Sequence, residues 1–481
     1  MESFKDFVGS NAKREIVAVQ GLGFVGFATA LVLATCASKD YAILGIEAQT
    51  KDGRKKASLF DKGLLEIESS DESFKASYSE ALQQKKLFGT SDPTTFGFAK
   101  IIVISVNLDV DLSNIKEDAS LSPKHSSDVK YSVSLDAFKK AIRTVGQHCD
   151  PNALVLLETT VPPGTTELVV WPILKEELEK RGLDWNGLAL GYSYERVTPG
   201  KNYLGSIVNS HRVYAGVNRQ SSIRVRTFLE TFINTDKYFV DELSNTTAAE
   251  MAKVLENSYR ATNIAFAVEW SRFAEATGVN LYDVVDVIRR RPTHANLMYP
   301  GIGVGGYCLT KDSYLADHSA REFFQLDGLP MSSFALSVNR RMPEYCAEFI
   351  VSEAKRLNIA IKALGILGVS YGPNIGDTRY SPVFDFANLM SSFGTTLSFH
   401  DPFIEHWDEL NVSVASDIAK FLNADTSVFA ICTKHDFYSS ADFLSELENC
   451  TKQILIFDCV GSLQKIKLPT NVAVLTLGSG D

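Results

Sequence analysis

The chain has 481 residues, of which 45% are hydrophobic and 22% charged, so it is long enough for several globular domains rather than one core. Lys and Arg number 48 against 58 Asp and Glu, and the net charge of −10 excludes a general nucleic-acid binder, which needs a basic surface. No run reaches the about 18 apolar residues of a membrane span, and the start of the chain is too polar for a secretory signal. The seven cysteines are scattered without a C-x-x-C pair, which predicts reduced thiols and no metal site. We therefore expect a cytoplasmic protein.

The first 210 residues alternate between strand-like and helix-like segments. Short β-branched or apolar runs predict strands at Ile16–Val19, Tyr41–Ile46, Ile101–Val106 and Leu154–Leu157. An Ala-rich helix is predicted over Phe27–Cys36, and the polar stretch 107–133 is predicted to be a surface loop. This alternation is typical of a doubly wound α/β domain, which we place at residues 1–210.

A glycine-rich segment, Gly21-Leu-Gly-Phe-Val-Gly26, follows the first predicted strand and opens a helix. Small residues there let the backbone approach a pyrophosphate at the helix N-terminus. Glu47 ends the second strand, where it accepts ribose hydroxyl hydrogen bonds and repels a 2′-phosphate, which favours NAD over NADP. We assign the cofactor contacts to Gly21, Gly23, Phe24, Val25, Gly26, Glu47 and Val106.

The block 211–329 reads as all-α. A long helix is predicted from Ser244 to Gly278, with a capping box at Thr247–Glu250, and a second helix over Tyr282–Arg290. Met251, Val254, Leu255, Ile264 and Phe266 predict that the long helix is largely buried. Lys253 and Asn257 share one of its faces. That face is either solvated or supplies a buried cation to a developing alkoxide or a ligand phosphate.

Cys308 ends a run with glycines at 301, 303, 305 and 306, and Asp312 follows four residues later. Such a loop lets backbone amides approach a ligand and stabilise an oxyanion or a thiolate, so we interpret Cys308 as a nucleophile. Two loop carboxylates, Glu158 and Glu195, follow apolar runs at the edge where α/β proteins bind ligands, although such a residue taken alone is more often a solvated loop carboxylate.

The α/β alternation returns in residues 330–481. Strands are predicted at Ala363–Leu367, Thr396–Phe399, Ser427–Ile431 and Ile454–Phe457, with a helix from Pro382. The predicted fold is therefore α/β, with two Rossmann-like doubly wound domains joined by a long central helix and an all-α connector.

Taken together, these motifs resemble the UDP-glucose/GDP-mannose dehydrogenase family over essentially the whole chain. The matching pieces are G-L-G-F-V-G (21–26), E-T-T-V-P-P-G-T-T (158–166), Y-E-R-V-T-P-G (194–200), A-E-M-A-K-V-L-E-N-S-Y-R-A (249–261), G-V-G-G-Y-C-L-T-K-D (303–312), G-D-T-R-Y-S-P (376–382), H-D-P (400–402) and T-K-H-D (433–436). The resemblance implies an NAD-dependent enzyme that oxidises the C6 primary alcohol of a UDP-sugar twice, to the uronic acid of a surface polysaccharide. It also implies a homodimer or larger homo-oligomer on the long helix, with no nucleic-acid or membrane partner.

The resemblance also supplies roles for matched residues. Cys308 would carry a thiohemiacetal and then a thioester. Lys253 and Asn257 would stabilise oxyanions, Asp312 and a water held by Thr160 would move protons, and Glu195 would support thioester hydrolysis. Thr160, Lys311 and Arg379 match positions near the cofactor. The implied substrate contacts are Glu195, Arg196, Lys253, Asn257, Tyr299, Gly305 and, as the nearest match to an expected arginine, Arg291.

The chain departs from the family pattern at several positions. Glu195-Arg-x-x-Pro-Gly looks like the UDP-N-acetylhexosamine branch, but Tyr194 replaces that branch's usual proline. Lys311-Asp312 looks like the UDP-glucose branch, and Gly372 stands where many relatives carry a lysine. We favour a UDP-N-acetylhexosamine of the GlcNAc or ManNAc type. The alternatives are UDP-glucose, a two-electron β-hydroxyacid dehydrogenase, which would not need Cys308, and a non-catalytic dinucleotide-binding protein.

Overall fold

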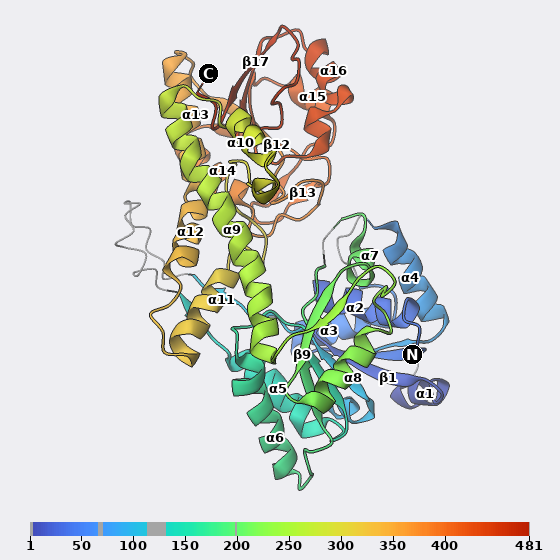
Figure 1. Cartoon of the computed structure of the whole chain (residues 1–481). Helices are drawn as coiled ribbons and strands as arrows, with labels where there is room; N and C mark the ends of the chain where they lie inside the picture. Colours follow the sequence, from blue (N-terminus) through green and yellow to red (C-terminus); the bar gives the residue numbers. More distant parts are fainter. Residues whose placement is uncertain (1–2, 66–70, 113–130, 198–199, 481) are drawn as a thin grey trace. The chain divides into compact units, whose positions relative to one another are not determined.

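The computed structural model describes residues 3–65, 71–112, 131–197 and 200–480. They form two compact units (Figure 1). The first contains the described residues up to Glu256 together with Tyr314–Gly328, and the second contains Asn257–Ser313 and the chain from Leu329 onward. Each unit is built on its own sheet.

The first unit holds an eight-stranded sheet in the order β3-β2-β1-β4-β7-β8-β9-β10. Its strands are β1 (Glu15–Gln20), β2 (Tyr41–Ile46), β3 (Leu87–Thr90), β4 (Ile101–Ile104), β7 (Leu154–Leu157), β8 (Ala189–Tyr192), β9 (Arg212–Gly216) and β10 (Val240–Glu242). Neighbours pair in parallel except β8 and β9. The four predicted strands are confirmed, and the strand order reverses between β1 and β4, where ligands bind in such folds.

The predicted domain boundary at residue 210 is wrong, as is an all-α block over 211–329. Strands β9 and β10, with α8 (Arg219–Leu229) between them, extend the first sheet. The residues of β10 are half-exposed or exposed, so its sequence lacks the apolar run that marks a buried strand.

Helices cover both faces of this sheet. Alternate residues of β1 belong to different cores: Val17 and Val19 pack with α2, and Ile16 and Ala18 pack with α5. The helices of this unit are α1 (Phe4–Ser10), α2 (Phe24–Thr35), α3 (Lys51–Phe60), α4 (Glu72–Gln83), α5 (Asp136–His148), α6 (Trp171–Lys180), α7 (Tyr203–Val208) and α8. Short turns η1 (Pro93–Phe98), η3 (Thr166–Val170) and η5 (Ser319–Phe323) complete it. Within the predicted loop 107–133, β5 (Val110–Asp111) pairs with β6 (Ser132–Val133), and 113–130 lies outside the described residues.

The long predicted helix is confirmed as α9 (Thr246–Thr277), and Gly278 ends it at a positive φ of 68°. The predicted capping box is wrong, because Asn245 caps the helix by accepting from the Ala248 N–H at 2.8 Å. The prediction of a largely buried helix is also wrong. Val254 is buried, whereas Met251, Leu255 and Phe266 are half-exposed or more, so the apolar residues form two faces.

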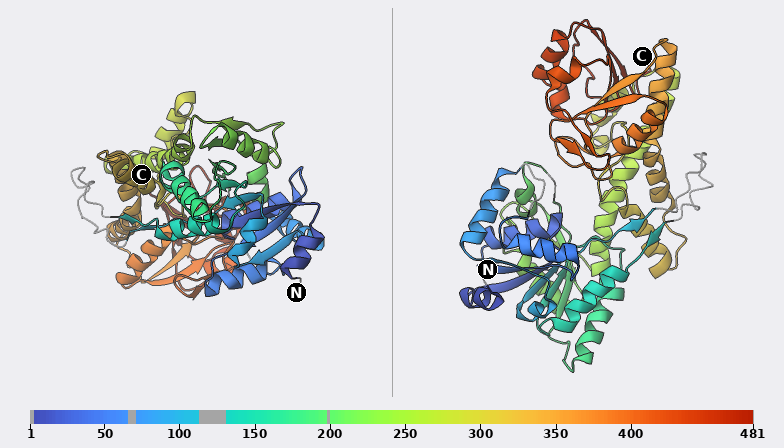
Figure 2. Two further views of the ribbon diagram at one scale, coloured as in Figure 1. Left: turned by 90° about the horizontal axis from the view of Figure 1, so that it is seen from below. Right: turned by 180° about the vertical axis from the view of Figure 1, so that it is seen from behind.

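The second unit contains a five-stranded parallel sheet in the order β12-β11-β15-β16-β17 (Figure 2, orange to red). Its strands are β11 (Ala363–Leu367), β12 (Thr396–His400), β15 (Val428–Ile431), β16 (Ile454–Asp458) and β17 (Val472–Thr476), with a hairpin of β13 (His406–Trp407) and β14 (Val412–Ser413). The helices are α10 (Leu281–Arg289), α11 (Asp312–His318), which continues into the first unit, α12 (Pro330–Arg340), α13 (Met342–Arg356), α14 (Pro382–Ser392), α15 (Ile418–Leu422) and α16 (Ala441–Asn449), with turns η4 (Pro292–His294) and η6 (Asp436–Ser439). The four strands predicted here are confirmed, and β17 was missed because its residues are half-exposed.

Both sheets are doubly wound, which confirms the predicted fold class. Among the described residues, we find no helix that combines the length and the apolarity needed to cross a membrane.

Candidate active site

The glycine-rich loop after β1 has the geometry of a dinucleotide site. Gly21 has a φ of 93°, and a Cβ on Gly26 would lie 1.9 Å from the carbonyl oxygen of Gly21, so both positions require glycine. Gly23 is the N-cap of α2, and a Cβ there would meet nothing within 4 Å. The loop therefore packs tightly against the sheet but leaves the N-terminus of α2 open to an anionic ligand.

The other predicted cofactor residues surround this loop. Glu47 accepts a hydrogen bond from the Leu22 N–H at 2.6 Å, which places its carboxylate beside the loop where this fold binds ribose. Val106 follows β4, and its carbonyl oxygen accepts from the Thr159 hydroxyl at 2.9 Å. Phe24 packs on Tyr203, with ring centroids 4.5 Å apart, and Val25 is half-buried. Their contacts with a cofactor stay a prediction.

Lys253 is buried, which contradicts the solvated face that was one of its two predictions, and its negative partner in the structure is a carboxylate of the protein. Its ammonium donates to the carbonyl oxygen of Glu195 at 3.0 Å and lies 3.7 Å from the Glu195 carboxylate. Glu195 is itself buried, in the loop after β8, and also accepts from the Val197 N–H. Thr198 and Pro199 of the same motif lie outside the described residues. The structure thus brings Lys253 and Glu195 together.

The loop that carries Thr160 is fixed by a carboxylate from α9. Thr160 is half-buried in the loop after β7. Glu250 accepts from the Gly164 N–H at 2.5 Å, from the Thr166 N–H at 2.8 Å and from the Thr166 hydroxyl at 2.6 Å. Burial raises the pKa of Glu250 to about 8, while these donors act in the opposite direction. Sequence reasoning missed this role, because Glu250 was assigned to a capping box.

Glu158, at the end of β7, is an internal residue rather than a solvated loop carboxylate. Its oxygens lie 3.4 Å from an Arg212 nitrogen and 3.2 Å from the Thr29 hydroxyl. Burial raises the pKa of Glu158, and the Arg212 charge acts in the opposite direction. This buried ion pair belongs to the framework behind the loops.

Asn257 meets Asp312 in the second unit, one helical turn along α9 from Lys253. The Asn257 amide donates to the buried Asp312 carboxylate at 2.6 Å, and the Lys311 ammonium lies 3.2 Å from its other oxygen. The N–H groups of Asp312 and Lys311 donate to the Cys308 carbonyl oxygen at 3.0 Å and 3.2 Å. The half-exposed Cys308 therefore sits on a turn whose position is coupled to Asn257 through Asp312.

Three of the glycines before Cys308 lie directly against other groups of the protein. A Cβ on Gly305 or Gly306 would come within 2.6 Å or 2.7 Å of the Tyr371 side chain, and one on Gly303 would lie 2.9 Å from the Asn339 carbonyl oxygen. Glycine is therefore required at these three positions to accommodate neighbouring protein groups, and the predicted approach of the loop amides to a ligand stays a prediction. Burial raises the pKa of Tyr371 to about 12, and negative charge on Asp377 and Cys308 adds to it.

The remaining predicted residues are spread over several positions. Arg196 pairs with Glu256 at 3.2 Å, and Arg379 pairs with Asp377 at 2.6 Å. Lys311 is buried against the Tyr307 ring, 4.5 Å from its centroid. The ring of Tyr299 stacks on that of Tyr282, with the ring centroids 5.6 Å apart. Arg291 is exposed at the start of η4, so the structure does not bring it to the Cys308 turn.

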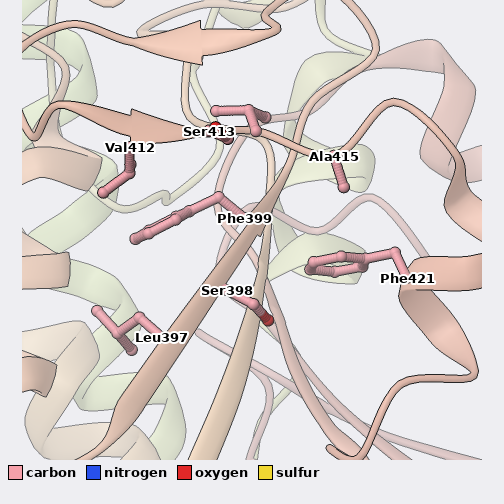
Figure 3. Close-up of a pocket in the computed structure, with 8 residues that line it drawn as sticks. Leu397, Ser398, Phe399, Val412, Ser413, Ala415 and Phe421 are labelled. Carbon is pink, nitrogen blue, oxygen red and sulfur yellow. The ribbon is translucent and has the colours of Figure 1, made fainter.

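A hollow in the second unit is lined by residues other than the site residues described above (Figure 3). It is formed by Leu397–Phe399 of edge strand β12, Val412–Ala415 and Phe421 of α15. Its lining is apolar apart from two serine side chains, so it offers no acid, base or nucleophile for chemistry. Within the described ranges, no group of His, Cys, Asp and Glu side chains is arranged to hold a metal ion.

Comparison with known proteins gives matches along most of the chain. Models of the UDP-glucose/GDP-mannose dehydrogenase family match residues 15–233 (NAD binding domain), 247–341 (central domain) and 365–465 (UDP binding domain). The UDP-N-acetyl-D-mannosamine dehydrogenase of Pyrococcus horikoshii is 28% identical over 92% of this chain and 94% of its own. An NDP-N-acetyl-D-galactosaminuronic acid dehydrogenase of Ralstonia nicotianae is 28% identical over 79% of this chain and 82% of its own. The solved UDP-D-ManNAc dehydrogenase of P. horikoshii superposes with a TM-score of 0.78 at 26% identity, covering 97% of this chain and 100% of that one.

Proposed function

The chain belongs to the UDP-glucose/GDP-mannose dehydrogenase family, and on that premise we propose that it oxidises the C6 primary alcohol of a UDP-N-acetylhexosamine to the carboxylate, with NAD as the oxidant. One observation carries the proposal. Helix α9 carries both Lys253, which contacts Glu195 within the first unit, and Asn257, which contacts Asp312 within the second. The Asp312 N–H in turn donates to the Cys308 carbonyl oxygen. A cation, an amide and a nucleophile are the groups that a double oxidation at one carbon requires.

The four-electron reaction explains why a thiol is needed. Bound NAD would accept a hydride in each of the two oxidations, and the Gly21–Gly26 loop with Glu47 would hold it. A free aldehyde lacks the tetrahedral carbon from which a second hydride can leave. Addition of the Cys308 thiolate to the aldehyde carbon restores that carbon, and its oxidation leaves a thioester on Cys308. Water then breaks the carbon–sulfur bond and releases the carboxylate and the thiol.

The side chains around this carbon would have separate tasks. The Lys253 ammonium and the Asn257 amide would stabilise negative charge on the reacting oxygen. Asp312 would take or return a proton next to Asn257, and Glu195 with a water on Thr160 would promote thioester hydrolysis. Arg379, a predicted cofactor contact beyond the glycine loop, donates to Asp377 in this structure.

Two observations support an N-acetylhexosamine as the sugar. The relatives named above act on N-acetylated sugar nucleotides, and residues 195–200 carry the sequence typical of that branch. We propose that the second unit's sheet, matched by the UDP binding domain, binds the UDP moiety at the carboxyl ends of β11 and β15, where its strand order reverses. The seven free cysteines are compatible with a reducing cytoplasm.

The exposed apolar stripe of α9 supports a homodimer. Phe266, Trp270 and Phe273 are about half-exposed, and their rings touch in sequence, with centroids 6.1 Å and 5.9 Å apart. Met251, Leu255 and Tyr259 continue the apolar residues along the same helix. A symmetric pairing of α9 with the helix of a second copy would cover this surface.

Counting NADH per sugar tests the proposed function. The parent protein, mixed with NAD and UDP-N-acetylmannosamine, UDP-N-acetylglucosamine or UDP-glucose, should release two NADH per molecule of its preferred substrate. Cys308→Ser should be nearly inactive, with Cys36→Ser, an exposed cysteine of the first unit, as the matched control. One NADH per substrate would favour a two-electron dehydrogenase, and full activity of Cys308→Ser would refute the covalent mechanism.

A further inference from the structure

Tyr194 forms one wall of the space around the Lys253 ammonium. The residue is buried in the loop after β8, immediately before Glu195. Its ring centroid lies 5.2 Å from the Lys253 Nζ, which also donates to the Glu195 carbonyl oxygen at 3.0 Å. An ammonium over an aromatic ring is attracted by the ring quadrupole, so the ring both orients the cation and takes the place of water beside it.

The hydroxyl of Tyr194 has a second set of partners. It donates to the Glu256 carboxylate at 3.2 Å and accepts from an Arg196 nitrogen at 3.0 Å. Arg196 also pairs directly with Glu256 at 3.2 Å and donates to the carbonyl oxygen of His211. Burial raises the pKa of Tyr194, so its hydroxyl stays protonated and remains a donor to Glu256. The hydroxyl thus contacts Glu256 and Arg196, while the ring contacts Lys253 and also Arg196, whose guanidinium carbon lies 5.3 Å from the ring centroid.

Tyr194 therefore contacts Lys253, Arg196 and Glu256, which belong with it to the first compact unit. Two of these residues are the ones to which we assign oxyanion stabilisation and substrate binding.

We propose that Tyr194 is a positioning residue: its ring holds the Lys253 ammonium in the orientation that stabilises the reacting oxygen, and its hydroxyl, together with the ring face under the guanidinium, fixes Arg196 for binding the sugar nucleotide. The proposal rests on the proposed function. It differs from a merely structural role in one respect, because the ring affects turnover and the hydroxyl affects substrate binding.

Three variants separate the ring from the hydroxyl. Tyr194→Phe keeps the ring, and Tyr194→Leu and Tyr194→Met remove it, the second with an unbranched chain in case the first folds poorly. We expect kcat of both ring-less variants to fall by roughly tenfold, in line with a desolvated cation–π contact, and kcat of Tyr194→Phe to stay near that of the parent. Tyr194→Phe should instead raise KM for the sugar nucleotide severalfold. The matched control is Tyr214→Phe, another buried ring of the first unit whose hydroxyl contacts a Glu–Arg pair, and it should change neither constant.

A second measurement does not depend on turnover. The rate at which acetic anhydride modifies Lys253, followed by peptide mass spectrometry, should increase severalfold in Tyr194→Leu and Tyr194→Met but not in Tyr194→Phe, because only the loss of the ring admits reagent and water to the ammonium. Equal kcat and equal labelling in the Phe and Leu variants would overturn the proposal. Absence of NADH release by the parent would contradict the proposed function alone, since the labelling comparison would still decide the role of the ring.

Discussion

Glu250 lies at the centre of the contact between α9 and the loop that carries Thr160. It is fully buried, and it accepts three hydrogen bonds from Gly164 and Thr166. Burial raises its pKa from an ordinary 4.5 to about 8. We expect Glu250→Gln to change how the stability of the first unit depends on pH.

The size of the effect follows from the pKa. Because the folded pKa is higher than the unfolded one, the stabilisation by protonated Glu250 is complete below pH 4.5 and is lost as the pH rises through about 8. Between the two pKa values, each pH unit lowers the free energy of unfolding by about 1.4 kcal/mol. The parent should therefore lose up to about 4 kcal/mol of stability through this group between pH 5 and pH 8. Glutamine cannot ionise and has no such loss. Its amide nitrogen would face the Gly164 N–H, which costs about 1–3 kcal/mol at every pH.

The two effects predict a crossing. The variant should be less stable than the parent at pH 5 and at least as stable at pH 8. Hydrogen exchange of the peptide 160–170 in increasing urea measures this in the first unit alone, which avoids treating a two-unit chain as a two-state system. Glu269→Gln, at an exposed position of the same helix, should show no crossing. A stability difference between Glu250→Gln and the parent that is constant from pH 5 to pH 8 would refute the reasoning.

Two further predictions concern the framework and the assembly. Arg212→Met leaves the buried Glu158 without its cation and should lower the free energy of unfolding of the first unit by about 3–5 kcal/mol, whereas Arg212→Met combined with Glu158→Gln should cost much less. Hydrogen exchange of β7 and β9 peptides in increasing urea measures this within the first unit, and equal losses in the single and double variants would contradict it. Trp270→Glu places a charge in the apolar stripe of α9 and should raise the dissociation constant of the proposed dimer at least about tenfold, measured by analytical ultracentrifugation. A monomeric parent protein, or a variant with the same dissociation constant as the parent, would contradict this prediction.

The sequence by itself determined the parts of this protein that depend on neighbouring residues. Buried strands such as Ile101–Ile104 are continuous apolar runs, and Gly278 ends α9 because glycine adopts a positive φ without strain. The glycine loop and Glu47 were recognisable because their spacing along the chain is fixed by one strand, one turn and one helix. Half-exposed edge strands such as β10 and β17 lack that local pattern, and sequence reasoning missed them.

Only the tertiary structure decided which groups face one another across long stretches of chain. Glu250 and Gly164 are 86 residues apart, and nothing in the sequence around Glu250 distinguishes a buried acceptor from a capping residue. The glycines before Cys308 predicted that another group approaches the backbone closely, and the structure shows the Tyr371 side chain next to Gly305 and Gly306. Lys253 likewise had two possible environments until the fold placed Glu195 and Tyr194 around it. Local patterns specify an element and its buried face, whereas the partner of a polar side chain is fixed only when distant elements pack together.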